Sequence, residues 1–307
     1  MQMEVFRNPH DRFVRDIFKE EKNAVSFFKT SLPKEISRLL DWKEFHSADN
    51  KFMLENLEQR EVDLLFSVGL SSGSSAKIYL LFEHKSYRDT KAFLQILGYL
   101  TEIYKNQSQN RNSLSVVIPV IFYQAQNKWD SGKRFIDQFE LDAKRNPQLH
   151  PYIPDFEILL FPLSEIDIPS FFSQPNLKFS LYLAQNIRAN KSVFLKSFYK
   201  GFQELKNIDS ESERLSILKK GLSYVFSVRK EKVEDILSVL NQTERSYYKE
   251  EIMTTAERLN RQGFRRGVKL EKLNIARKMI SLNFDLKTIL KVTELSKKDL
   301  KDHKILP

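Results

Sequence analysis

The chain has 307 residues, enough for one large domain or two ordinary ones, and 12% of them are aromatic, which suffices for a hydrophobic core. It has no cysteine, which excludes disulfides, thiolate metal sites and cysteine nucleophiles. The net charge of +10 is concentrated at one end, because residues 187–307 carry 27 Lys and Arg against 16 Asp and Glu, whereas residues 1–186 carry 23 against 24. A basic half attracts polyanions, usually nucleic acid, although a solvated lysine-rich helical surface explains the same charge.

Hydropathy argues against a membrane protein. No stretch reaches the roughly 18 consecutive apolar residues of a membrane-spanning helix, and residues 1–13 lack the apolar core of a secretory signal. The absence of cysteine fits a reducing compartment. We therefore expect a cytoplasmic protein with no membrane partner.

Helices and strands are mixed in the first part of the chain. Apolar spacing predicts a helix over residues 11–28, with a break near 22–23, and a strong helix over residues 90–105. A short helix is expected over 34–40, whereas residues 43–58 are expected to be irregular, with a strand near Phe45 as the alternative. Apolar and β-branched runs predict four further strands, at residues 61–70, 76–85, 114–124 and 156–166.

From about residue 170 onward, one helix follows another. The predicted helices span residues 177–206, 211–228, 232–260, 265–282, 285–292 and 296–303. Neither an internal repeat nor a low-complexity linker interrupts the chain. The change of pattern predicts an α/β domain over residues 1–175, followed by an all-helical basic region over residues 176–307.

Two acidic residues flank a predicted hairpin at equal distances from its turn. Gly73 lies at the centre of the turn, with Asp63 ten residues before it and Glu83 ten residues after it. If the hairpin is symmetric about Gly73, the two carboxylates are cross-strand neighbours, with Cβ atoms about 4.5–5.5 Å apart. Lys85 then points to the same side as Glu83, because side chains alternate along a strand. A shift of one residue would instead put the two acids on opposite faces.

Two carboxylates at this distance repel, and each raises the pKa of the other unless a cation lies between them. Mg²⁺ prefers such hard oxygen ligands, and with its bound water it promotes phosphodiester hydrolysis. A lysine two residues on can hold or deprotonate that water, or stabilise the developing charge. The pattern thus predicts Asp63 and Glu83 as metal ligands and Lys85 as a catalytic group. The alternative is a plain cross-strand ion pair.

Other polar residues are candidates for a supporting role. Gln95 and Tyr99 are four residues apart in the predicted helix and share one of its faces, where they would bind phosphate or orient the carboxylates, or simply pack half-buried. Asp11 is expected as the N-cap of the first helix, with a peripheral acidic role at the site as the alternative. His84 should point to the face opposite Glu83 and pack there.

Several stretches resemble the Rpn family of recombination-promoting nucleases, also called putative transposases, in the PD-(D/E)XK nuclease superfamily. They follow the family's order over residues 8–170, and residues 274–300 resemble the tail common in that family. The stretches are NPHDRFVRDIF, SLPKEI, LLDW, EVDLLFSV, IYLLFEHKSYRD, LGYLTEIYK and VIPVIFYQAQNKW. The resemblance implies an α/β fold, a restriction-endonuclease-like core of order α-β-β-β-α-β with a mixed sheet flanked by helices.

The catalytic pattern of the superfamily maps onto Asp63 and onto Glu83-His84-Lys85. Val62 stands where the superfamily has a proline before the aspartate. Lys85 stands where many Rpn-type members have glutamine; this is closer to the parent superfamily and favours retained activity. The segment from Gln95 to Tyr99 is similar to the Q-x-x-x-Y element of RecB-like nucleases.

The resemblance therefore implies a Mg²⁺-dependent DNA endonuclease, with Mn²⁺ as a possible substitute, associated with the nucleoid through its substrate. A link to recombination or mobile elements, and DNA rather than RNA as the substrate, follow from the family alone. The competing expectation is a catalytically inactive nuclease fold that serves as a nucleic-acid-binding or protein-interaction module.

The C-terminal residues 285–303 are compatible with a small helix-turn-helix in which Ser296 caps the second helix. A packing or dimerisation segment is the alternative, and a homodimer is possible. The basic residues expected to contact DNA are Arg265, Arg266, Lys297, Lys298, Lys301 and Lys304.

Overall fold

The computed structural model describes residues 8–48, 64–73, 77–110, 113–139, 146–303 and 305–306, with all their side chains except those of Lys77, Asn110 and Arg266. The chain is divided into two compact units. The first is Asn8–Tyr224, and the second begins at Val225. The predicted boundary near residue 175 marks the change from mixed to helical structure, whereas the first compact unit continues to Tyr224. Across the described ranges, every helix is too short or too polar to cross a membrane.

A mixed sheet forms the centre of the first unit, as expected. In the described residues it has five strands in the order β1-β2-β3-β4-β5, antiparallel from β1 to β3 and parallel from β3 to β5. The strand that was the alternative near Phe45 is present as β1. The strands are β1 (Leu40–Ser47), β2 (Leu64–Leu70), β3 (Lys77–Lys85), β4 (Val117–Tyr123) and β5 (Leu159–Pro162).

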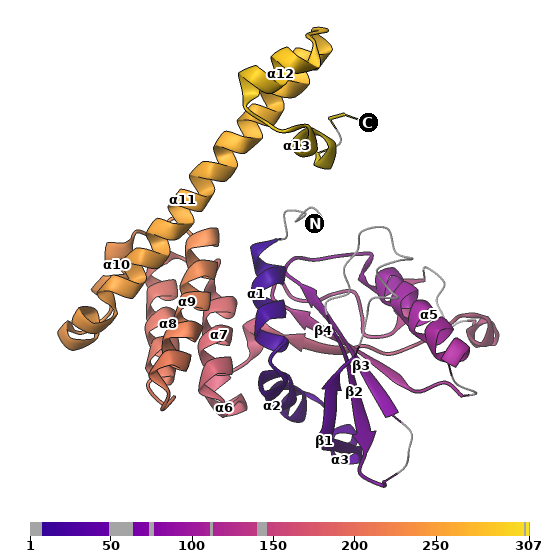
Figure 1. Ribbon diagram of the computed structural model, residues 1–307. Coiled ribbons are helices and arrows are strands. Elements are labelled where there is room, and N and C mark those ends of the chain that lie inside the picture. Colours follow the sequence, from indigo (N-terminus) through magenta and orange to yellow (C-terminus); the bar gives the residue numbers. More distant parts are fainter. Residues whose placement is uncertain are drawn as a thin grey trace. The chain divides into compact units, whose positions relative to one another are not determined.

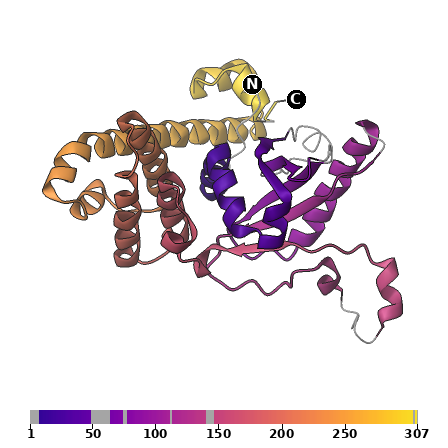
Figure 2. The ribbon, with the colours of Figure 1, turned by 90° about the horizontal axis from the view of Figure 1, so that it is seen from below.

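Helices cover both faces of this sheet (Figures 1 and 2). The helices α1 (Pro9–Phe18) and α2 (Glu21–Ser31) lie on one face, and α5 (Ala92–Asn110) lies on the other. Because neighbouring residues of a strand point to opposite faces, Phe82 of β3 faces α2, and Leu81 faces α5. The element order is therefore the α-β-β-β-α-β order that the family resemblance implies.

Phenylalanines fill the layer between the sheet and the first two helices. Phe27 is fully buried, and its ring lies 5.8 Å from that of Phe82 and 4.7 Å from that of Phe161, measured between ring centroids. Aromatic pairs at such distances stabilise a core beyond their area burial. On the other face, a second core joins α5 to the strands; its members include Leu65, Leu81, Ile96, Tyr99, Ile121 and Tyr123.

Some predicted boundaries were wrong. The predicted helix over 11–28 is two helices, and the first begins earlier, at Pro9, because Asn8 is its N-cap and accepts a hydrogen bond from the backbone N–H of His10. Asp11 is therefore not the cap. The predicted strand over 156–166 contracts to Leu159–Pro162, where a 3₁₀ turn begins at Leu163.

The predicted helix over 177–206 is also divided, because Asn190 caps a new helix by accepting a hydrogen bond from the backbone N–H of Val193. Short and long helices complete this part of the chain. They are α3 (Lys34–Leu39), η1 (Phe135–Gln138), η2 (Pro147–Tyr152), η3 (Leu163–Glu165), α6 (Ile168–Phe171), α7 (Pro175–Asn186), α8 (Lys191–Leu205) and α9 (Glu211–Val228).

The second unit is helical. The predicted break between residues 260 and 265 is absent, because one helix of 40 residues runs from Gln242 to Ser281 through two glycines, each of which costs only about 1 kcal/mol in a helix. Its C-terminal end packs with two short helices around a small core that includes Leu273, Ile289 and Leu300. The helices are α10 (Val233–Ser238), α11 (Gln242–Ser281), α12 (Leu286–Thr293) and α13 (Lys297–Asp302).

The aromatic layer generates a stability prediction. Replacing Phe27 by alanine should lower the free energy of unfolding of the first unit by about 3–5 kcal/mol, because it removes a fully buried ring from a packed aromatic cluster. Replacing Phe171, whose side chain is 41% exposed, should cost less than about 1 kcal/mol. Urea denaturation of both variants measures the difference, and equal losses of stability would contradict this account of the core.

Candidate active site

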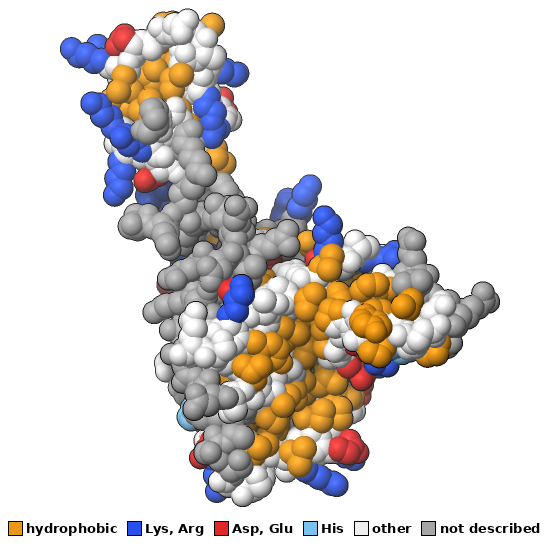
Figure 3. Space-filling view, turned by 90° about the vertical axis from the view of Figure 1, so that its right-hand side faces the viewer, with side chains coloured by type: hydrophobic (Ala, Val, Ile, Leu, Met, Phe, Trp, Pro, Cys, Tyr) orange, Lys and Arg blue, Asp and Glu red, His pale blue; other side chains and the backbone are white. Residues whose placement is uncertain are grey.

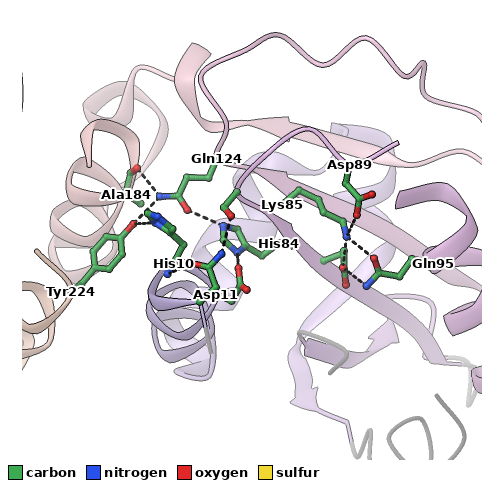
Figure 4. Close-up of polar contacts among 12 residues, drawn as sticks. His10, Asp11, His84, Lys85, Asp89, Gln95, Gln124, Ala184 and Tyr224 are labelled. Atoms are coloured by element: carbon green, nitrogen blue, oxygen red, sulfur yellow. Dashed lines mark hydrogen bonds and ion pairs between the residues drawn. The ribbon is translucent and has the colours of Figure 1, made fainter. Parts of the chain in front are cut away.

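Glu83 and Lys85 occupy the last positions of β3. They lie opposite Ile121 and Tyr123 of the parallel strand β4, and both side chains point toward α5, because residues two apart in a strand share a face. Figure 4 shows the Lys85 amine at the centre of a group of polar side chains. Both residues are buried, because only 3% of the surface of Glu83 and 6% of that of Lys85 is exposed. Glu83 and Lys85 thus share one side of the strand, as predicted.

The Lys85 ammonium is held by three oxygen atoms. Its Nζ donates to Glu83 Oε1 at 3.0 Å, to Asp89 Oδ2 at 2.9 Å and to Gln95 Oε1 at 2.6 Å. An ammonium group has three protons, so this arrangement gives each of them an acceptor. The side chain is therefore directed into the site by contacts from β3, from the following loop and from α5.

Gln95 and Tyr99 project from one face of α5 toward the same group, as their spacing predicts. Because Lys85 only donates, Gln95 must turn its carbonyl oxygen to the amine, and its Nε2 then donates to Glu83 Oε1 at 2.9 Å and to the Tyr99 hydroxyl. The amide thus ties the acid to the lysine. Both residues support the position of the Glu83 carboxylate.

Burial and charge act in opposite directions on this pair. Burial raises the pKa of Glu83 to about 7, although the Lys85 charge beside it opposes the shift. For Lys85, burial disfavours the charge, but the carboxylates of Glu83 and Asp89 outweigh it and raise the pKa of the amine. Lys85 is therefore an ammonium at neutral pH, suited to hold a water or phosphate oxygen and to stabilise negative charge.

One oxygen of Glu83 has no partner among the described residues. Its Oε2 is buried and receives no hydrogen bond, whereas Oε1 receives two. A buried carboxylate oxygen without a partner is costly, and a metal ion is one ligand that would satisfy it. The donor set thus fits a hard cation. Among the described residues, however, no three His, Asp or Glu side chains converge on one point.

The second predicted ligand, Asp63, lies outside the described residues. The hairpin that leads to it has the predicted register, because Leu64 pairs with Phe82 and Phe66 pairs with Leu80, symmetrically about Gly73. Gly73 has a φ of 71°, a conformation that glycine adopts easily. The expected pairing of Asp63 with Glu83 stays a prediction.

His84 points to the other face of the sheet, as predicted, and it meets Asp11 there. Its Nδ1 lies 2.8 Å from Asp11 Oδ1, and its Nε2 lies 2.8 Å from Gln124 Oε1. A supporting acidic role at the site was the alternative expectation for Asp11. The structure instead places its carboxylate against the ring of His84, behind the strand that carries Glu83.

This second polar group connects β3 to three helices of the first unit. Gln124 donates through Nε2 to the Ala184 carbonyl at 2.8 Å and to the Tyr224 hydroxyl at 2.9 Å, and the same hydroxyl lies 2.7 Å from His10 Nδ1. The helices are α1, α7 and α9 (Figure 4). Because the backbone N–H of Gln124 also donates to the Lys85 carbonyl, the network restrains the strand end that bears the site.

Sequence reasoning did not find Asp89, Gln124 or Tyr224. Asp89 stands in the loop after β3, and an aspartate followed three residues later by the start of a helix resembles an ordinary cap. Gln124 could have been recognised from the sequence, because it directly follows a buried strand that lies next to the strand carrying Lys85. Tyr224 is 100 residues from Gln124, so no local pattern announces their contact.

The second unit holds the predicted DNA-contacting residues. Ser296 caps α13 through its hydroxyl, as predicted, and the side chains of Lys297, Lys298 and Lys301 are exposed on that helix. Arg265 is exposed on α11, whereas the side chain of Arg266 and the whole of Lys304 lie outside the described set. Figure 3 shows Lys and Arg side chains spread around the C-terminal helices at the top of the view.

Two family models match separate parts of the chain. A family model described as "Putative transposase, YhgA-like" matches residues 8–213, and one described as "Rpn/YhgA-like nuclease family, C-terminal HTH domain" matches residues 269–304. The second match covers α12, α13 and the end of α11, and it supports the helix-turn-helix interpretation of this segment. No solved structure matches the chain.

Two curated proteins of Escherichia coli (strain K12) align along nearly their whole length. Recombination-promoting nuclease RpnA is 24% identical, and the inactive recombination-promoting nuclease-like protein RpnE is 22% identical. Each alignment covers 95% of this chain and 96% of the relative. Since the first family model covers well over half of the residues and the relatives align from end to end, the chain belongs to the YhgA-like putative transposase family, whose relatives include the Rpn nucleases.

Proposed function

We propose that this protein is a divalent-metal-dependent DNA endonuclease. The observation that carries the proposal is the buried Glu83 carboxylate. Within the described part of the chain one of its oxygens has no partner, and the ammonium of Lys85 lies 3.0 Å from the other. An acid and an ammonium held together in a buried site match the requirements of metal-assisted phosphodiester hydrolysis. The name of the relative RpnA, a recombination-promoting nuclease, supports the same reaction class.

Glu83 and Asp63 would hold the ion, Mg²⁺ or alternatively Mn²⁺. When bound, the ion would draw charge from a phosphoryl oxygen and lower the pKa of a coordinated water. The pairing of Asp63 with Glu83 is supported by the register of the preceding pairs, which continues to them if it is extended by one position. Glu83 Oε2 is the atom best suited to contact the ion, because Oε1 already receives two hydrogen bonds.

Lys85 has the role of a charged positioning group. Two carboxylates keep it protonated, so it would bind the attacking water or a non-bridging phosphate oxygen and stabilise the charge that develops in the transition state. Gln95 keeps the amine and the acid in place through its two polar atoms. Tyr99, in contact with Gln95, restrains that amide in turn.

DNA is the proposed substrate because of the C-terminal segment. A helix-turn-helix places its second helix in the groove of duplex DNA, and lysine and arginine contacts to the phosphates hold it there. In this chain the second helix, α13, exposes Lys297, Lys298 and Lys301. The segment would supply DNA affinity, while the first unit would supply cleavage. Localisation to the cytoplasm and nucleoid, and a role in recombination, are expectations that accompany this proposal.

The alternative is a DNA-binding protein without nuclease activity. It is favoured by one observation, the relative RpnE, which aligns over 95% of the chain and is named inactive. In that case the acid–lysine pair would be a structural ion pair, and the helix-turn-helix would retain its binding role. Cleavage of supercoiled plasmid with Mg²⁺ or Mn²⁺ separates the two proposals, because binding without cutting supports the alternative.

Substitution of the proposed site residues should abolish cleavage. We expect Glu83→Gln and Asp63→Ala each to lower the rate of plasmid cleavage with Mn²⁺ by at least about 10³-fold, because each removes a metal ligand, and Lys85→Met by about 10²-fold or more. Glu165→Gln, which neutralises an exposed acid elsewhere in the first unit, is the matched control and should cut at the wild-type rate. Cutting that survives both ligand substitutions would place the active site elsewhere.

Cleavage should depend on pH through Glu83. The protonated form of Glu83 is neutral and binds a cation poorly. At a fixed, subsaturating Mn²⁺ concentration the cleavage rate should therefore fall up to about tenfold for each pH unit below the pKa of about 7. Above that pKa the rate should level off. Initial rates between about pH 5.5 and 8.5 test this expectation. A rate that is constant down to pH 5.5 would contradict it.

Glu83 also makes the stability of the metal-free protein depend on pH, in the direction opposite to that of the cleavage rate. The folded-state pKa lies above the ordinary value of 4.5, so the folded chain binds more protons, and its stability should decline as the pH rises from about 4.5 to about 7. In Glu83→Gln this contribution is absent, so the wild-type protein should lose stability relative to the variant across that interval. Urea unfolding in EDTA measures the difference.

The lysines of α13 should control DNA affinity. Replacing Lys297, Lys298 and Lys301 together with glutamine should weaken binding to duplex DNA and reduce the slope of log K against log salt by about one for each phosphate that is no longer neutralised. The control replaces three exposed lysines of α8, which are Lys191, Lys196 and Lys200. Fluorescence anisotropy over a salt series distinguishes the variants, and equal losses of affinity would mean that net charge alone determines binding.

A further inference from the structure

Asp89 is a third acidic residue at the site that neither the sequence pattern nor the proposed reaction uses. It lies in the loop between β3 and α5, and its side chain is only 17% exposed. One oxygen, Oδ2, accepts from Lys85 Nζ at 2.9 Å, and the other, Oδ1, accepts from the backbone N–H of Lys91 at 2.9 Å. Both oxygens are therefore engaged by protein donors, so this carboxylate is placed as an anchor for the lysine.

The Lys85 ammonium is thus shared between two carboxylates at nearly equal distances, 3.0 Å to Glu83 Oε1 and 2.9 Å to Asp89 Oδ2. A divalent cation on Glu83 would repel this ammonium strongly, because two positive charges would meet in a buried site of low dielectric. Binding of the ion to Glu83 Oε2 therefore weakens the contact between the amine and Oε1. Without another acceptor, the displaced ammonium would be buried and incompletely neutralised, at a cost to metal affinity.

We propose that Asp89 is a positioning residue that takes over the Lys85 ammonium when a divalent cation binds Glu83. This inference rests on the proposed function, since it assumes that Glu83 is a metal ligand. With Asp89 Oδ2 and Gln95 Oε1 as its remaining acceptors, the amine stays at the site, where it can contact a phosphate. Asp89 thereby increases metal affinity and keeps the lysine in place.

Asp89 also has a local structural role, which a test must separate from the proposed one. Its side chain caps the turn before α5 through the contact with Lys91, and its carbonyl oxygen accepts from the backbone N–H of Ala92 at 3.2 Å. Asparagine performs the same capping about equally well. In Asp89→Asn, the remaining oxygen can keep the contact with Lys91, while the amide nitrogen faces Lys85 and cannot accept its proton.

The experiment is a double-mutant cycle on Mn²⁺ affinity, measured by calorimetry on the full-length chain without DNA. The four proteins are the wild type, Asp89→Asn, Lys85→Met and the double variant. We expect Asp89→Asn to weaken Mn²⁺ binding about tenfold when Lys85 is present, and less than about threefold in Lys85→Met, where no ammonium has to be displaced. Lys85→Gln replaces Lys85→Met in a second cycle, in case methionine impairs folding.

Asp137→Asn is the matched control for capping, because Asp137 caps the 3₁₀ turn η1 through the backbone N–H groups of Lys133 and Arg134 and lies outside the site. It should leave Mn²⁺ affinity unchanged within about twofold. Circular dichroism and thermal unfolding of every variant verify that the fold is retained.

The outcomes separate this inference from the proposed function. Equal reductions of affinity by Asp89→Asn in both backgrounds, or no reduction in either, would overturn the role of Asp89, even if plasmid cleavage and its dependence on Glu83 are observed. The expected coupling together with a failure to cleave DNA would retain this role and reject the nuclease proposal. Absence of Mn²⁺ binding in all variants at millimolar concentrations would reject both.

Discussion

The Lys85 ammonium, held among Glu83, Asp89 and Gln95, is the interaction on which the site depends. Removing an acid and an amine from water costs several kcal/mol for each ion, and such a pair is tolerated only if its geometry is good and its remaining polar atoms are satisfied. Here the amine has three acceptors, and one acid oxygen has two donors. Glu83 Oε2 is the one carboxylate oxygen of this pair that has no hydrogen-bond partner among the described residues.

The fold supplies this arrangement by burying both faces of one strand end. The side of β3 that carries Glu83 is covered by α5, from which Gln95 reaches the acid and Tyr99 contacts Gln95. The opposite side carries His84, which is held by Asp11 and Gln124. On a sheet exposed to water, the hydrogen bonds around Glu83 and around His84 would both be weaker, because water would compete for them. The polar groups on the two faces therefore restrain the same short piece of backbone.

Membership of the YhgA-like family does not by itself decide activity, since one relative is named a nuclease and another is named inactive. What bears on the question is the chemistry retained at the site. A chain without catalytic activity would be under no requirement to bury an acid and a lysine at a strand end, because hydrophobic residues of similar volume are often equally or more stabilising. The buried acid and lysine, with the glutamine that contacts both, are the features on which the nuclease proposal rests.

The sequence by itself determined the order of the elements, the alternation that puts Glu83 and Lys85 on one face and His84 on the other, and the shared helical face of Gln95 and Tyr99. These features follow from local periodicity, and the register about Gly73 follows from a symmetric turn. Only the tertiary structure decided that Asp11 serves His84, that Asp89 shares the lysine, and that Tyr224 meets Gln124 across 100 residues. Contacts of this kind depend on how whole elements pack and on which loop conformation follows a strand, and no spacing of residues along one element encodes them.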